Sequence, residues 1–315
     1  MRVAIVGAGS IGASFAVVFA RAGAAVSVHD TDTARLADAE ADIARRLESL
    51  AAGGLLNEAP DTVAARIRPF GDLAEAVAGT EHVQECAPES LELKRELFAR
   101  LDALAPADAV LASSSSALTA SSFADGLPGR GRCLVAHPGN PPYLLPVVEL
   151  VPAPFTAADV VERARRLFER AGMTPVLVRR EIEGFVFNRL QGALLREAYC
   201  LVRDGVASAA DIDRVVRDGI GRRYAVLGPF ETAELNTRGG IAAHAEKLGP
   251  AYARMGAERG QQDPWTPELV ATVAKDVRER VPEGRWEERV AWRDAALIAL
   301  ERARRESGLF TETAA

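Results

Sequence analysis

Lysine, cysteine and aromatic side chains are scarce in this sequence of 315 residues. Only three of its 38 basic residues are lysines, and aromatic residues make up 6% of the chain. Its three cysteines (Cys86, Cys133 and Cys200) are far apart and form no CxxC pair. An odd number of scattered cysteines argues against a disulfide framework and a thiolate metal site, and it fits a reducing cytoplasm.

An excess of positive charge is also missing. The formal net charge is -6, so we expect neither a nucleic-acid partner nor a general affinity for anionic membranes. With 48% hydrophobic and 26% charged residues, the composition is that of a globular protein. A chain of this length forms one large domain or two smaller ones.

One long uncharged run, residues 3–20, superficially resembles a signal peptide or a short membrane span. It is interrupted by Gly7, Gly9 and Gly12, and its most apolar part, residues 3–6, has only the length of a strand. We therefore expect a soluble, cytoplasmic protein without a membrane partner.

Short apolar runs alternate with helical patterns in the first half of the chain. The expected strands are 2–7, 24–30, a short one around Ile67, 81–86, 109–113, 132–137 and, as the last, 176–182. The expected helices are 10–22, 33–51, 72–78 and 91–104. This alternation predicts an α/β fold with a Rossmann-type, doubly wound parallel sheet over residues 1–182.

The pattern changes after residue 182. Apolar residues recur at spacings of three and four over 184–203, as one face of a helix requires. Further helical patterns cover 208–218, 240–256, 266–280 and 284–306, with no strand pattern between them. Residues 183–315 are therefore predicted to form an all-helical second domain.

The clearest local motif is Gly7-x-Gly9-x-x-Gly12 between the first strand and the first helix, which Ser10 and Ile11 begin. Such glycines permit a tight turn, a close approach of pyrophosphate to the backbone and close helix–strand packing. Asp30 ends the next strand, where it would accept hydrogen bonds from a ribose and repel a 2′-phosphate. The motif predicts an NAD site rather than an NADP site; the alternative is a glycine-rich turn in a fold without a nucleotide.

A second motif is His137-Pro-Gly-Asn140-Pro-Pro, followed by Glu149. The prolines force a turn, which lets the chain return and place a carboxylate beside the imidazole. Such a carboxylate fixes the tautomer and favours the imidazolium that forms when His137 accepts a proton. The alternative is a structural histidine and a glutamate that faces outward.

Four serines, 113–116, follow the strand at 109–113, at the edge where doubly wound sheets bind ligands. One of them would suffice to cap a helix, which is the alternative. The sequence holds no GxSxG motif, so a serine hydrolase is not expected. Asn188 is a candidate site residue only because it lies at the predicted junction of the two domains.

Several segments together resemble the 3-hydroxyacyl-CoA dehydrogenase superfamily, and within it the L-gulonate 3-dehydrogenase branch, which includes lens crystallins. They are QECAPESLELKRELF (84–98), SSSSAL (113–118), VAHPGNPPYLLPVVELVP (135–152), GFVFNRLQ (184–191) and GIGRRYAVLGPFET (219–232). The resemblance extends over the chain to about residue 236 and is weak beyond it. Gly139 departs from the family pattern, and nothing clearly marks a pocket for the adenine of CoA.

The resemblance also implies roles for single residues. His137 would be the general base and Glu149 its partner. Matching positions assign contacts with the reacting substrate oxygen to Ser116 and Asn188, and contacts at the nicotinamide end of NAD to Glu89, Lys94 and Asn140.

The implied activity is NAD-dependent oxidation of a 3-hydroxy acid, with a free acid such as L-gulonate as the leading substrate. Alternatives are a 3-hydroxyacyl thioester on CoA or a carrier protein, a carnitine-type acid, or a crystallin-like structural or NAD-sensing role. The substrate would lie between the domains, and the second domain would form a homodimer interface.

A free acid needs a cation for its carboxylate, and Arg223, which matches the arginine of the family's RYAxxGP segment, is predicted to supply it. Alternatively, Arg222 and Arg223 are solvated, or pair with Asp218 or Glu231.

Overall fold

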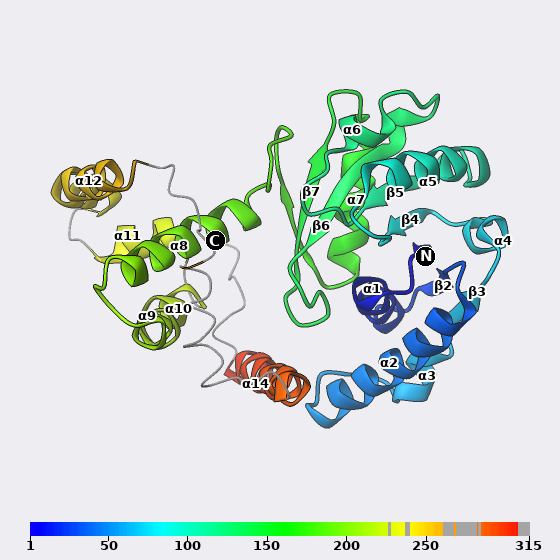
Figure 1. The fold of residues 1–315 in the computed structure, drawn as a ribbon. Helices are drawn as coiled ribbons and strands as arrows, with labels where there is room; N and C mark the ends of the chain where they lie inside the picture. Colours follow the sequence, from blue (N-terminus) through cyan, green and yellow to red (C-terminus); the bar gives the residue numbers. More distant parts are fainter. Residues whose placement is uncertain (226–227, 237–239, 261–267, 269–281, 283–284, 308–315) are drawn as a thin grey trace. The chain divides into compact units, whose positions relative to one another are not determined.

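The computed structural model describes residues 1–225, 228–236, 240–260, 268, 282 and 285–307. The chain divides into two compact units. The first comprises Met1–Arg189 and Asp294–Glu306, and the second comprises Leu190–Arg293 and Ser307–Ala315. Among the described residues, the strands all belong to the first unit, and the elements of the second are helical (Figure 1).

A single sheet of eight strands forms the centre of the first unit, in the order β3-β2-β1-β4-β5-β6-β7-β8. The strands are β1 Arg2–Val6, β2 Ala25–His29, β3 Ile67–Phe70, β4 His82–Glu85, β5 Val110–Ser113, β6 Cys133–Pro138, β7 Val147–Pro152 and β8 Thr174–Leu177. Neighbours from β3 to β6 are parallel, β7 pairs antiparallel with β6, and β8 is parallel to β7. The predicted Rossmann-type sheet is confirmed.

Helices cover both faces of this sheet. They are α1 Ser10–Arg21, α2 Thr33–Ala52, α3 Pro60–Ala64, α4 Leu73–Val77, α5 Leu91–Leu104, α6 Ala120–Ala124 and α7 Ala158–Arg170, with a 3₁₀ turn, η1, at Arg130–Arg132. Apolar residues of α1, α2 and α7 form the core on one face, where the rings of Phe15 and Phe168 lie 6.2 Å apart. On the other face α4, α5 and α6 pack, with Phe98 and Phe123 at 4.4 Å.

The strand order reverses at β1, which lies between β2 and β4. Doubly wound sheets bind ligands at such a point, outside the carboxyl ends of the strands. The glycine turn after β1, the segment after β4 and the serines after β5 all leave the sheet at this edge. The topology therefore gathers most of the predicted site residues at one edge.

The predicted strand at 176–182 is wrong in its bounds, because β8 is Thr174–Leu177. Its last ladder bond runs from the amide of Val178 to the carbonyl of Leu150, at 2.9 Å. Beyond this point Glu181 accepts a hydrogen bond from the amide of Ser121 (2.9 Å), at the start of α6. After Val178 the chain therefore turns away from the edge of the sheet and runs to the amino end of α6.

The helix α7 was not among the sequence predictions, although its pattern is plain in retrospect. Val160, Ala164, Leu167 and Phe168 are buried and recur at helical spacing. No side chain caps its first turn, so the usual start signal is missing. Packing of this amphipathic face against the sheet fixes the helix instead.

The helices after residue 186 are α8 Phe187–Arg203, α9 Ala209–Val215, α10 Gly221–Tyr224, α11 Pro229–Asn236, α12 Gly240–Arg259 and α14 Trp286–Ser307, with a π-helical turn, η2, at Val216–Ile220. They confirm the predicted helical character of this part of the chain. The predicted helix at 266–280 lies outside the described residues, apart from residue 268. In α14, Ile298 belongs to the core of the first unit and lies against Gly53 at the end of α2. No described helix has the length and the apolar character needed to span a bilayer.

Candidate active site

The turn from β1 to α1 has the geometry of a nucleotide-binding loop. Gly7 has a φ of +108°, and a Cβ there would lie 2.7 Å from the carbonyl carbon of Cys86. A Cβ on Gly12 would collide with the carbonyl oxygen of Gly7, whereas one on Gly9 would meet nothing within 4 Å. The first and third glycines therefore serve packing, and the space over Gly9 is left for a ligand.

Asp30 lies directly after β2 and faces this turn. Its Oδ2 accepts a hydrogen bond from the amide of Ala8 (2.9 Å), and its Oδ1 accepts one from the amide of Asp32 (3.1 Å). Each carboxylate oxygen keeps a lone pair for a ribose hydroxyl. These residues fit NAD: the amino end of α1 would hold the pyrophosphate, and Asp30 would hold the adenosine ribose.

Arg46 of α2 is a contact of this loop that the sequence did not reveal. Its guanidinium donates to the hydroxyl (3.0 Å) and to the carbonyl (3.1 Å) of Ser10, and it lies over the ring of Tyr143 at 5.2 Å. A single arginine thus joins the first turn of α1 to the segment that connects β6 with β7. Ile11, the other residue predicted at the start of α1, is half-buried there.

His137 and Glu149 face each other across the antiparallel pair β6–β7, in direct register. The Nδ1 atom of His137 lies 2.8 Å from Oε2 of Glu149, and both side chains are buried. The other oxygen, Oε1, accepts hydrogen bonds from the amides of Val186 (2.7 Å) and Phe187 (2.9 Å), where α8 begins. One carboxylate thus holds the imidazole and the start of a helix together.

The ionisation of Glu149 sets the tautomer of His137. Burial raises the pKa of this carboxyl, but the hydrogen bonds from His137, Phe187 and Val186 outweigh burial, and the pKa lies below its ordinary value. An ionised Glu149 only accepts hydrogen bonds, so neutral His137 carries its proton on Nδ1. The unprotonated Nε2 is then the atom that can accept a proton from a substrate.

Phe185 was also missed, and it shapes this site. Gly184 and Phe185 both have positive φ values, +74° and +49°. The Phe185 ring is fully buried, with its centroid 5.5 Å from that of His137. A positive φ in a bulky residue is uncommon, and here it turns the chain so that two consecutive amides reach Glu149. The only sequence signal was the glycine in GFVFNRLQ.

Ser116 and Asn188 come together although 72 residues separate them. The side-chain amide of Asn188 donates to the carbonyl of Ser116, at 3.3 Å. Asn188 follows the helix start that binds Glu149, and Ser116 follows β5, which is the neighbour of β6. Both residues therefore lie at the edge of the sheet that carries His137.

Lys94 is buried and ion-paired. Its Nζ lies 2.9 Å from each oxygen of Glu85 and 3.6 Å from Oε2 of Glu89. Glu85 was not a sequence candidate; it also accepts hydrogen bonds from the hydroxyl of Ser113 (2.5 Å) and the amide of Ala87 (2.7 Å). The lysine thus neutralises a buried carboxylate below the segment that follows β4.

Glu89 holds the serine segment in place. Its Oε1 accepts hydrogen bonds from the hydroxyl of Ser115 (2.5 Å) and from the amides of Ser116 and Ala117 (3.0 Å each). Burial raises the pKa of Glu89, but these bonds and Lys94 outweigh it and lower the pKa. The contacts of Glu89 and Lys94 with the nicotinamide end of NAD stay predictions.

Asn140 is exposed in the turn between β6 and β7, where it precedes a cis proline. The neighbouring Gly139, which departs from the family pattern, has a packing role, because a Cβ there would lie 2.9 Å from Cγ1 of Val147.

Arg223 lies in α10 of the second unit and is exposed, while Arg222 beside it is 3.6 Å from Asp218. In the described part of the chain, no cluster of three or more His, Cys, Asp or Glu residues could hold a metal ion.

Two family models together match most of the chain. The NAD-binding domain of 3-hydroxyacyl-CoA dehydrogenase matches residues 2–182, and the C-terminal domain of the same enzyme matches residues 184–285. A lambda-crystallin homolog of Bos taurus is 42% identical over 306 residues, which cover 95% of this chain and 94% of that protein. An L-carnitine dehydrogenase of Streptomyces griseus is 40% identical over 266 residues, covering 84% of this chain and 76% of that protein.

A similar solved structure is that of 5-formyl-3-hydroxy-2-methylpyridine 4-carboxylic acid 5-dehydrogenase, described as an NAD+-dependent dismutase. It superposes with a TM-score of 0.80 at 27% identity, covering 96% of this chain and 97% of the other.

Proposed function

Since the chain belongs to the 3-hydroxyacyl-CoA dehydrogenase family and is an NAD-dependent oxidoreductase acting on CH–OH groups, we propose that its substrate is a free 3-hydroxy acid, with L-gulonate as the leading candidate. Two similarities support a free acid. The chain resembles an L-carnitine dehydrogenase and a dehydrogenase of a pyridine carboxylic acid, and both named compounds carry a free carboxylate. We propose that Arg223 pairs with the substrate carboxylate, as a charge-assisted contact.

The observation that carries the proposed mechanism is the His137–Glu149 pair, with Nδ1 and Oε2 at 2.8 Å. His137 accepts the proton of the substrate 3-hydroxyl at Nε2, and Glu149 stabilises the imidazolium that results. Bound NAD would accept the hydride from C3, the carbon that bears this hydroxyl, and the product is the 3-oxo acid. Ser116 and Asn188 hold the reacting oxygen beside the imidazole.

The cellular compartment and the oligomeric state of the protein are also part of the proposal. Burial raises the pKa of the thiols of both Cys86 and Cys133 to about 12. Such protonated thiols fit a cytoplasmic protein. We also propose that the chain forms a homodimer through its helical unit.

Replacement of His137 by Gln tests the role of the base. Proton transfer by a positioned side chain contributes about 10²–10⁴-fold, so kcat should fall by a factor in this range. Glu149→Gln should lower kcat by a smaller factor, because the imidazole stays while the group that orients it and stabilises its charge is weakened. The measurement is NADH formation at saturating substrate.

The matched control is the dissociation constant of NADH, measured by fluorescence titration, which should be nearly the same in the wild type and in both variants. A His137→Gln enzyme that keeps the wild-type kcat would remove this residue from the mechanism.

A further inference from the structure

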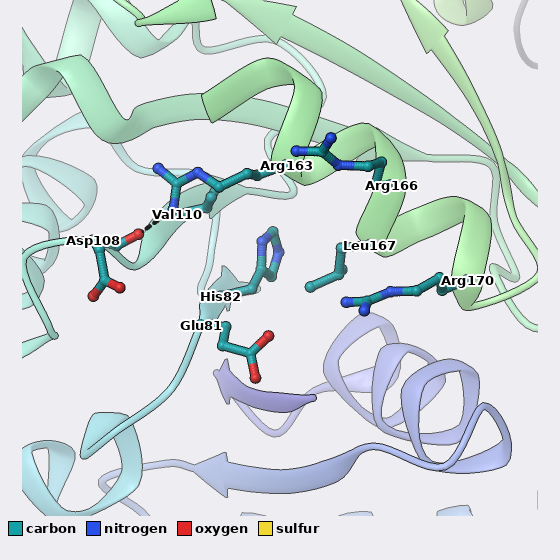
Figure 2. Close-up of a pocket in the computed structure, with 8 residues that line it drawn as sticks. All are labelled: Glu81, His82, Asp108, Val110, Arg163, Arg166, Leu167 and Arg170. Carbon is teal, nitrogen blue, oxygen red and sulfur yellow. Dashed lines mark hydrogen bonds between the residues drawn. The ribbon is translucent and has the colours of Figure 1, made fainter. Parts of the chain in front are cut away.

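A pocket lies at the edge of the sheet opposite the candidate active site. It has a volume of about 310 Å³ and is lined by the residues that begin β4 and β5 and by one face of α7. The helix contributes Arg163, Arg166 and Arg170, whereas Glu81 and Asp108 come from the sheet side. Figure 2 shows the imidazole of His82 among them, with the guanidinium groups of Arg163 and Arg170 on either side in this view.

The arginines of this pocket are only partly neutralised. Arg166 lies 3.6 Å from Glu162, but Glu162 is held more closely by Arg165, at 2.7 Å. Arg170 has no carboxylate within ion-pair distance among the described residues. On the sheet side, Glu81 lies 3.6 Å from the N-terminal ammonium group. The α7 wall of the pocket therefore keeps positive charge for a ligand.

His82 supplies a different feature, an unused acceptor at the base of the pocket. Its ring is fully buried and packs against Phe19 and Phe168, with centroids at 6.0 Å and 5.5 Å. Its Nε2 lies 3.0 Å from Oε1 of Gln84. Among the described residues, its Nδ1 has no hydrogen-bond partner.

The neighbours of Gln84 determine the tautomer of His82. The amide nitrogen of Gln84 donates to the hydroxyl of Ser114 (2.8 Å) and to the carbonyl of Ala136 (3.3 Å). Its oxygen therefore faces His82 and accepts the proton of Nε2. Burial lowers the pKa of His82 to about 4, so the ring is neutral near pH 7. Nδ1 is then a bare acceptor, which a hydroxyl group can satisfy and a fully deprotonated anion cannot.

We propose that this pocket binds a small hydroxylated phosphate ester, whose phosphate contacts Arg166 and Arg170 and whose hydroxyl donates to Nδ1 of His82. Arginine forks match phosphate oxygens, and a buried acceptor without a partner favours a ligand that brings a donor. The volume is that of a small-molecule site. This site is separate from the candidate active site and does not depend on the proposed reaction.

The test is isothermal titration calorimetry of the full chain with sn-glycerol 3-phosphate. The protein is saturated with NADH, so that the phosphate-binding turn of the cofactor site is occupied. The double variant Arg166→Gln/Arg170→Gln should raise the dissociation constant by about tenfold or more. The matched control, Arg45→Gln/Arg100→Gln, loses the same charge from exposed positions outside the pocket and should change it by less than about twofold.

A second comparison isolates the hydroxyl contact. In the wild type, sn-glycerol 3-phosphate should bind more tightly than n-propyl phosphate, its analogue without alcohol groups, and His82→Phe should remove this difference. Two results would overturn the proposal: no binding up to about 10 mM, or equal losses in the pocket and control variants. No turnover is measured, so failure of this site and failure of the proposed reaction are distinguishable.

Discussion

The sequence predicts the contacts of some residues better than those of others. The roles of Gly7, Gly12 and Asp30 follow from short-range geometry, because the turn, the helix and the next strand are close in sequence. The approach of Glu149 to His137 is also a local event, since a proline-rich turn joins their strands. Such contacts could be predicted because few backbone paths connect the residues.

Other contacts could not be predicted, for identifiable physical reasons. The amides of Val186 and Phe187 bind Glu149 through the backbone, and every residue except proline carries an amide. The pairing of Glu85 with Lys94 depends on the burial of both charges, which no spacing reveals. Arg46 reaches Ser10 only because α2 packs beside α1.

His82 supports a prediction about stability and pH. Its pKa is about 4 in the folded chain, against an ordinary 6.5, because burial disfavours the charged ring. The unfolded chain therefore binds a proton first as the pH falls. The stability that neutral His82 provides is complete above pH 6.5 and declines between pH 6.5 and about 4, by about 3 kcal/mol at most.

The measurement is urea unfolding of the wild type and of His82→Phe at several pH values in this window. The variant cannot take up this proton, so its stability relative to the wild type should improve steadily on acidification. A difference in unfolding free energy that stays constant from pH 7 to pH 4 would contradict the account.

At the scale of elements, most of the helices and strands can be predicted from the sequence. The structure differs from these predictions where tertiary contacts override the local sequence pattern. The chain leaves β8 early because Glu181 binds the start of α6. The helix α7 forms without a side-chain cap because its apolar face packs on the sheet. Helical character after residue 186 was predictable, since its periodicity does not depend on partners.

The β1–α1 turn gives a prediction at this scale, from two glycines of one motif. Gly9→Ala should fold with an unchanged melting temperature, because a Cβ there meets nothing within 4 Å, but NADH should bind about tenfold or more weakly. In Gly12→Ala the new methyl group collides with the carbonyl of Gly7, so the melting temperature should fall by about 5 °C or more.

Differential scanning fluorimetry with and without NADH measures both effects. The assignment of the open space over Gly9 to the cofactor would fail if Gly9→Ala bound NADH as tightly as the wild type does.

At the scale of the whole molecule, the second unit exposes large apolar side chains. The exposed fractions are 62% for Leu190, 62% for Val215, 77% for Phe230 and 56% for Met255. Subunit interfaces are enriched in such residues, so a homodimer would bury surface that is costly to leave in water. Light scattering after gel filtration should give twice the chain mass of 33.5 kDa, and a monomer at micromolar concentration would refute the dimer.

The central claim is that the enzyme oxidises a free 3-hydroxy acid, and kcat/KM with NAD measures it most directly. L-Gulonate, carnitine, 3-hydroxybutyrate and 3-hydroxybutyryl-CoA are compared for the wild type and for Arg223→Met. We predict the highest kcat/KM for L-gulonate, and a KM for L-gulonate that rises by about tenfold or more in the variant while activity on the thioester is unchanged. A preference for 3-hydroxybutyryl-CoA in the wild type, or equal losses on both substrates in the variant, would contradict the claim.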